Sequence, residues 1–94
     1  MQNGVLNLSS SGTLPTEDAQ VAEVEAAERL IDAIEAPLTD QEAEALLACF
    51  GSDACFGLAC SLLHLIETSP TAFPPVEPET TANPWVRLLW ERQQ

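Results

Sequence analysis

Hydrophobic residues recur every three or four positions over residues 16–36, which is the spacing of one face of an α-helix. The positions that follow this spacing are Val24, Ala27, Leu30, Ile31 and Ile34. Thr16 is a suitable N-cap, and Pro37 disfavours helical geometry at the residue before it. The pattern therefore predicts a helix over residues 16–36 with one apolar face.

Two further helices are predicted from Thr39 onward, joined by a very short turn. Thr39 and Glu42 have the spacing of a capping box, in which each side chain bonds to the backbone of the other residue. This motif predicts a helix over residues 39–50. Residues 53–68 are apolar nearly all round, which predicts a helix at the centre of the fold.

A short sequence echo lies across the turn between these two helices. Ala48-Cys49-Phe50-Gly51 is followed by Ala54-Cys55-Phe56-Gly57, and two copies do not make an architectural repeat. We interpret the echo as a packing feature. Gly51 is expected to end a helix in a left-handed conformation, and Gly57 is expected to let another backbone approach closely.

Both ends of the chain depart from these regular patterns. Residues 1–15 are polar, with serine and glycine and no sustained apolar period, which predicts a flexible N-terminal arm. Residues 69–82 contain four prolines, which predict an extended crossover without a helix, pinned by Phe73 and Val76.

Asn83 followed by Pro84 is typical of a helix start and predicts a last helix over residues 83–92. We expect its Trp85 and Leu89 to pack back on the other helices. At 94 residues the chain has room for one domain only. The sequence thus predicts an all-α fold, a small single-domain bundle of about four helices (residues 16–94) around a central apolar third helix.

Charge narrows the range of partners. The chain has 15 acidic and 3 basic residues, a formal charge of −12, and no lysine. Such a surface repels nucleic acid and anionic lipid, so we expect neither as a direct partner. Residues 39–68 have the outline of a helix-turn-helix, but the second helix offers no Arg, Lys, Asn or Gln to bases.

Residues 17–44 hold 10 of the 15 acidic residues and a single arginine. A solvated face that maintains solubility is one interpretation, and a docking surface for a basic protein is the other. We expect partner contacts from one flank of the first helix and from the tryptophans of the last. The candidate partner-binding residues are Asp18, Val21, Glu25, Glu28, Asp32, Glu35, Trp85 and Trp90.

No motif in the sequence indicates an enzyme, a metal site or a cofactor. Cys60 and His64 are four residues apart and share a helix face, yet two ligands do not make a zinc site. The three cysteines form no Cys-x2-Cys pair, so buried free thiols are expected. Acyl carrier proteins carry phosphopantetheine on the serine of an Asp-Ser-Leu motif. Here the order is reversed, Ser52-Asp53, and the leucine is missing, so no residue of this chain corresponds to that serine.

These features favour a small non-enzymatic protein-binding module. Its most concrete form is an inhibitor that docks on a basic partner, such as a nuclease or another toxin or effector, in the style of immunity proteins and antitoxins. The alternative is a structural helical homodimer or larger homo-oligomer formed through the tryptophan-bearing last helix. The N-terminus lacks the basic region followed by an apolar region that is typical of a secretory signal, and no apolar stretch is long enough to cross a bilayer. We therefore expect a cytoplasmic protein that does not bind membranes.

Overall fold

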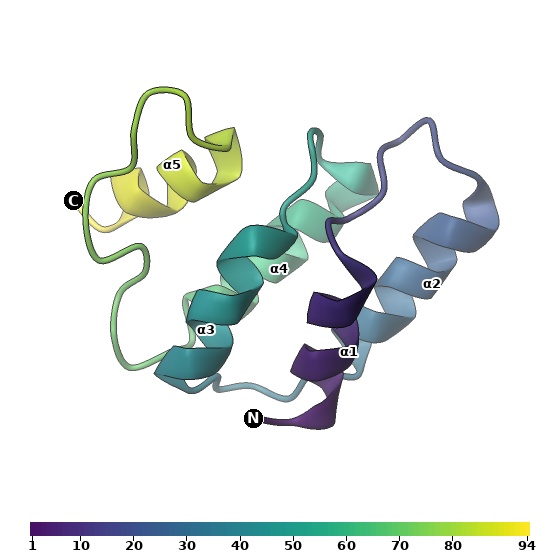
Figure 1. Cartoon of the computed structure of the whole chain (residues 1–94), viewed down its shortest axis with the longest axis horizontal. Coiled ribbons are helices and arrows are strands. Elements are labelled where there is room, and N and C mark those ends of the chain that lie inside the picture. The colour runs from purple at the N-terminus through teal and green to yellow at the C-terminus, as the bar shows by residue number, and fades with distance from the viewer.

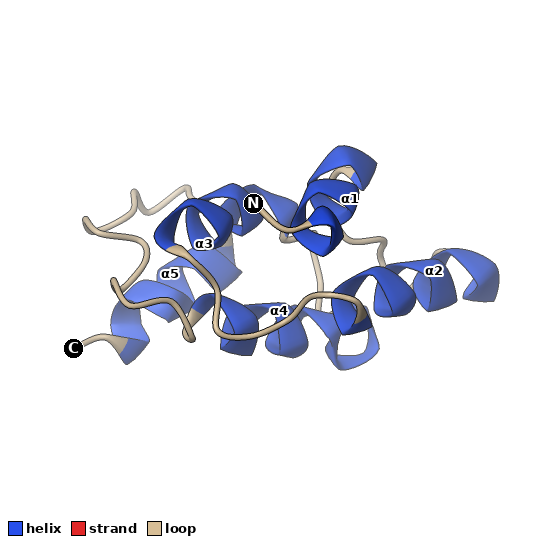
Figure 2. Ribbon diagram, turned by 90° about the horizontal axis from the view of Figure 1, so that it is seen from below, coloured by secondary structure: helices blue, strands red, loops and turns tan.

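The computed structural model describes residues 1–94 and contains helices and loops but no strands (Figures 1 and 2). The elements are α1 (Asn3–Ser11), α2 (Val21–Asp32), α3 (Asp40–Leu46), η1 (Leu47–Cys49), η2 (Cys55–Gly57), α4 (Leu58–Ile66) and α5 (Pro84–Arg92), where η marks a short 3-10 helix. The predicted all-α fold is confirmed, with five α-helices instead of about four. In Figure 2, α1 and α3 lie on one side of the core and α2 and α4 on the other.

The N-terminus differs from its prediction as a flexible arm. Residues Asn3–Ser11 form α1, which packs against α2 and α3 and buries Val5 and Leu8. Leu14, in the following segment, is also buried, and its backbone N–H donates to the carbonyl of Cys49 (2.8 Å). The first fifteen residues therefore complete the hydrophobic core.

Gln2 fixes the start of α1 by bonds to residues far away in the sequence. Its backbone N–H donates to Oε2 of Glu42 (2.9 Å). Its side-chain amide accepts from the backbone N–H of Glu35 (2.8 Å) and donates to the carbonyl of the same residue (2.9 Å). These three bonds join the N-terminus to Glu35, between α2 and α3, and to the first turn of α3.

The helix predicted over residues 16–36 is shorter at both ends, because α2 spans Val21–Asp32. Residues 16–19 form a turn, in which the N–H of Ala19 donates to the carbonyl of Thr16 (3.0 Å). The backbone N–H of Glu17 donates to Asp53 (3.0 Å), and the Glu17 carboxylate accepts from the N–H of Phe56 (3.1 Å). Glu17 is thus used in tertiary bonds and does not form part of a first helical turn.

The capping box that starts α3 is confirmed. The hydroxyl of Thr39 accepts from the N–H of Glu42 (3.2 Å), and the Glu42 carboxylate accepts from the N–H of Thr39 (2.9 Å). The α-helix ends at Leu46 and continues as η1, so the segment predicted to end at residue 50 tightens in its last turn.

The roles predicted for the two glycines of the sequence echo, Gly51 and Gly57, are exchanged in the structure. Gly51 is buried, and a Cβ there would lie 2.5 Å from the carbonyl oxygen of Leu14, so Gly51 permits a close backbone approach. Gly57 has a φ of 92° and is the left-handed residue that precedes α4. The third predicted helix consequently begins at Leu58 instead of residue 53.

The central position of α4 is confirmed, since α4 packs against α2, α3 and α5. Its buried residues are Leu58, Ala59, Leu62, Leu63 and Ile66. Cys60, Ser61 and His64 are exposed, so the helix has one solvated face that its apolar composition did not indicate. No helix of the structure has the length and apolar character required to cross a bilayer.

The last helix docks as predicted. The side chain of Asn83 accepts from the N–H of Trp85 (2.9 Å) and donates to the carbonyl of Gly51 (3.0 Å). The rings of Trp85 and Phe50 are stacked, with centroids 6.3 Å apart, and Leu89 is buried. In the proline-rich segment that precedes α5, Phe73 is half-buried against the core, whereas Val76 is 70% exposed and does not pin the chain.

Candidate protein-binding surface

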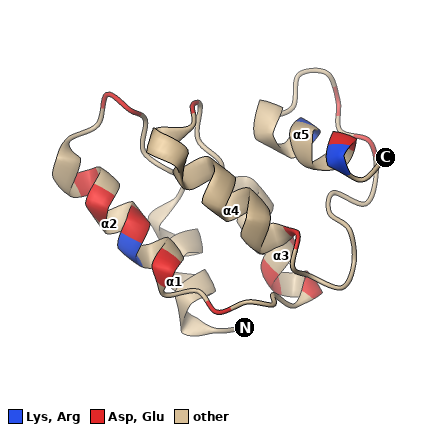
Figure 3. Cartoon of the chain, turned by 180° about the vertical axis from the view of Figure 1, so that it is seen from behind, with Lys and Arg blue, Asp and Glu red and all other residues tan.

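One flank of α2 presents a row of exposed side chains. The helical spacing places four exposed residues on this flank: Val21, Glu25, Glu28 and Asp32. Ala27 and Ile31 occupy the buried side of the same helix. Figure 3 shows the acidic residues of α2 along one side of the molecule, interrupted by one basic position. Six of the eight candidate residues therefore lie in or next to α2, since exposed Asp18 and Glu35 lie just beyond its two ends.

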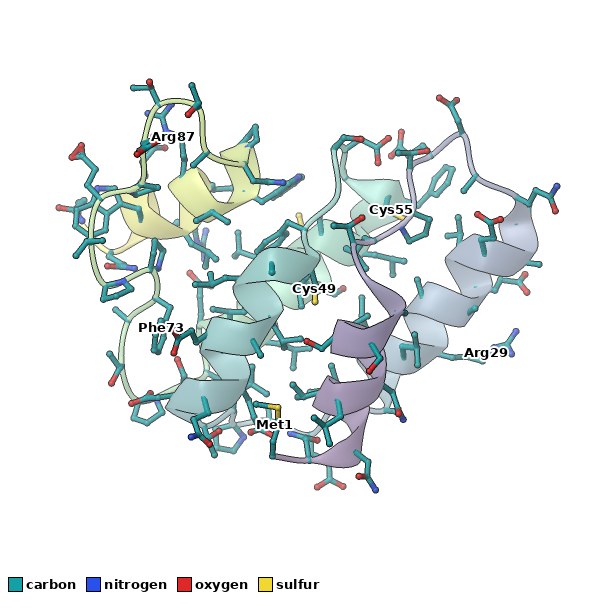
Figure 4. The ribbon with its side chains drawn as sticks, in the orientation of Figure 1. Met1, Arg29, Cys49, Cys55, Phe73 and Arg87 are labelled. Carbon is teal, nitrogen blue, oxygen red and sulfur yellow. The ribbon has the colours of Figure 1, made fainter.

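Few cations balance this acidic flank. Arg29 pairs with Glu25 at 3.7 Å, one helical turn away, and points away from the body of the molecule (Figure 4). The second ion pair of the structure, between Arg92 and Glu67 (2.6 Å), lies elsewhere and joins α5 to the end of α4. Glu28, Asp32 and Glu35 form no ion pair, so their charges face solvent.

The two candidate tryptophans do not belong to this surface. They lie on α5, and in Figures 1 and 2 α5 and α2 occupy opposite ends of the molecule. Trp85 is stacked on Phe50, and Trp90 is half-buried beside a small hollow of about 190 Å³ that Pro78 and Arg87 also line. The predicted site is therefore two separate surfaces, one acidic and one aromatic.

Two surface hollows are lined by few charged side chains. A hollow of about 520 Å³ lies between residues 11–16 and α2, and Glu23 is its only titratable residue. Another of about 410 Å³ lies between Thr80 and α5, where Arg87 and Glu91 are its charged residues. Neither hollow contains a cysteine or a histidine.

The cysteines fall into two classes. Cys49 and Cys55 are buried, Cys49 after α3 and Cys55 just before α4 (Figure 4), and burial raises the pKa of both thiols. Cys60 is exposed, which corrects the expectation that all three thiols are buried. His64 lies on the same solvated face of α4, and no group of three or more His, Cys, Asp or Glu side chains is placed to hold a metal ion.

The sequence does not indicate one feature beside the turn that leads into α2. The pattern predicts Phe56 inside a central helix, but its side chain is 67% exposed near the end of residues 53–57, a loop that includes the short η2 and is called the 53–57 loop. Only Asp53 gives a local signal in the sequence, since aspartate commonly accepts from the backbone N–H two residues later. The bonds from Glu17 that complete this loop span more than thirty residues, and no local pattern indicates them.

Comparisons with known proteins add no relative. A scan against protein-family models, a search of curated protein sequences and a search of solved structures each give no match to this chain.

Proposed function

We propose that this protein is a non-enzymatic binding module that docks on a basic protein through the exposed flank of α2. The observation that carries the proposal is the row of exposed carboxylates on a well-formed helix, where Arg29, paired with Glu25, is the only cation. Like charges held in a row repel one another and reduce the stability of the free protein. Lys and Arg side chains of a partner relieve this repulsion and also accelerate the encounter.

In its most specific form the proposal is an inhibitor. A protein with a basic active site, such as a nuclease or another effector, attracts the acidic flank in place of its own anionic substrate. The three free cysteines, one of them exposed, are typical of a reducing compartment. We therefore place this function in the cytoplasm.

The experiment that tests the proposal is a pull-down with the tagged full-length protein from its native lysate, washed at about 50 mM and then about 500 mM salt. The expected result is one basic protein that is retained at low salt and released at high salt, followed by reconstitution of the complex from purified components. Retention of no basic protein at low salt would contradict the proposal.

A second candidate function is self-association through α5, which the exposure of Leu88 beside Trp85 favours. Aromatic and aliphatic side chains in a shallow hollow are common at protein interfaces. Light scattering over a range of protein concentrations separates the two candidates. Self-association predicts a mass that rises with concentration and changes little with salt, whereas the binding module predicts a monomer.

A further inference from the structure

The 53–57 loop presents an aromatic side chain to solvent beside the acidic turn that leads into α2. Phe56 is 67% exposed, whereas the other four aromatic residues of the chain are buried or half-buried. Two residues after the 16–19 turn, α2 begins with Val21, which is 71% exposed. The turn and the loop meet at the same end of the molecule (Figure 1).

Three hydrogen bonds hold this loop in one conformation. The carboxylate of Asp53 accepts from the N–H of Cys55 (2.9 Å) with one oxygen and from the N–H of Glu17 (3.0 Å) with the other. The carboxylate of Glu17 in turn accepts from the N–H of Phe56 (3.1 Å). Phe56 is thus presented by a backbone that is fixed before any partner arrives.

Folding alone does not account for a phenylalanine at this position. Phe56 has a φ of 53°, a left-handed conformation that is unfavourable for a bulky side chain and better suited to Asn or Gly. Its neighbour Cys55 shares this conformation (φ 45°), but its side chain is fully buried in the core. Phe56 has the strained backbone without the compensating burial.

The charges around the loop indicate the chemistry of a partner. Glu17 and Asp18 lie in the turn and Asp53 lies in the loop, and Arg29 is the only Lys or Arg in residues 1–86. A pocket that receives Phe56 therefore meets carboxylates on its rim, and a rim of Lys or Arg side chains is complementary to them.

We propose that Phe56 is the apolar anchor of the acidic surface and inserts into an apolar pocket bordered by Lys or Arg on the partner protein. This inference rests on the proposed function and deepens it. The carboxylates of α2 guide the encounter, and the buried ring slows dissociation. An aromatic side chain held in a fixed conformation loses little entropy when it binds.

The first test separates a binding role from a folding role. Phe56→Asn introduces asparagine, which tolerates the left-handed conformation, so the melting temperature is expected to stay unchanged or to rise by a few degrees. Phe50→Ala, at a buried and stacked aromatic, is the control and is expected to lower it. A clear decrease for Phe56→Asn would assign the ring to the fold and overturn the proposal.

The second test uses two synthetic cationic peptides of equal charge, one of lysine and serine only and one in which leucine replaces the serines. Affinities are measured by titration with NMR detection on the labelled full-length protein. The wild type is expected to bind the leucine peptide about tenfold more tightly than the serine peptide. The NMR signals of residues 53–57 are expected to change their chemical shifts on binding. Phe56→Asn is expected to remove this preference and to leave the affinity for the serine peptide unchanged.

The matched control is Val76→Asn, which removes an equally exposed apolar side chain from the proline-rich segment and is expected to keep the tenfold preference. A preference for the leucine peptide that survives in Phe56→Asn would overturn the anchor and leave the proposed function standing. Failure of both peptides to bind the wild type would count against the proposed function and the anchor together.

Discussion

At the residue scale, Glu42 is a buried carboxylate that accepts hydrogen bonds from backbone N–H groups at the starts of two helices. Its side chain accepts from the backbone N–H of Thr39 at the start of α3 and from that of Gln2 at the start of α1. These donors, Thr39 first, hold the pKa of Glu42 below its ordinary value and outweigh the opposing effect of burial. The charged form therefore belongs to the folded state.

This arrangement predicts a specific dependence of stability on pH. The pKa of Glu42 is lower in the folded chain than in the unfolded one. Its contribution to the free energy of unfolding is therefore complete above about pH 4.5 and is lost as the pH falls through the pKa of the folded state. Glu42→Gln leaves one backbone donor without its acceptor and is expected to cost about 1–3 kcal/mol at neutral pH.

Urea unfolding of both proteins between about pH 7 and pH 3 checks this prediction. The difference in unfolding free energy between the wild type and Glu42→Gln is expected to shrink below about pH 4.5. The other carboxylates titrate in both proteins, so they cancel in the difference. A constant difference over the whole range would contradict the role assigned to the charge.

At the element scale, α1 is the part of the fold that the sequence did not indicate. Its interior-facing residues, Val5 and Leu8, are too few to establish a helical period, and the rest of the helix is Asn, Ser, Gly4 and exposed Leu6. Its stability comes from burial against α2 and α3 and from the long-range bonds of Gln2. Local pattern cannot reveal an element that is stabilised mainly by tertiary contacts.

Leucine truncation in α1 distinguishes a core helix from a flexible arm. Leu8→Ala removes a buried side chain and is expected to lower the free energy of unfolding by about 2–5 kcal/mol. Leu6→Ala, on the exposed side of the same helix, is the control and is expected to change it by less than about 0.5 kcal/mol. Equal, small effects in chemical denaturation would mean that α1 does not pack.

The other elements show which signals in a sequence are reliable. The caps at Thr39 and Asn83 are local motifs, and both helices begin where these motifs predict. The predicted starts of α2 and α4 are too early, because hydrogen bonds of Glu17 and Asp53 join the 16–19 turn to the 53–57 loop and hold both segments outside the helices. The periodicity of the sequence predicts which positions of α2 are exposed. The distance of Trp85 from α2 depends instead on the path of residues 69–82, which has no periodic pattern.

At the scale of the whole molecule, the charge distribution is asymmetric. All three arginines are exposed or half-exposed, and two of them lie on α5, at the end of the molecule opposite α2 (Figure 3). With a formal charge of −12, the folded protein repels itself, and the repulsion is strongest where carboxylates lack partners.

Salt therefore has a predictable effect on stability. Raising sodium chloride from about 20 mM to about 200 mM screens the repulsion and is expected to raise the melting temperature. The triple variant Glu25→Lys, Glu28→Lys and Asp32→Lys halves the net charge, so its melting temperature is expected to depend less on salt. Circular dichroism melts check this, and a salt-independent wild type would contradict it.

The most direct test of the account is whether binding of a basic protein follows the charges of α2. The triple α2 variant is compared in salt-washed pull-downs with a matched triple reversal at exposed acids near the other end, namely Glu77→Lys, Glu79→Lys and Glu91→Lys. We expect the α2 variant to lose the basic protein that the wild type retains, and the matched variant to keep it. Equal retention by both variants would contradict the account.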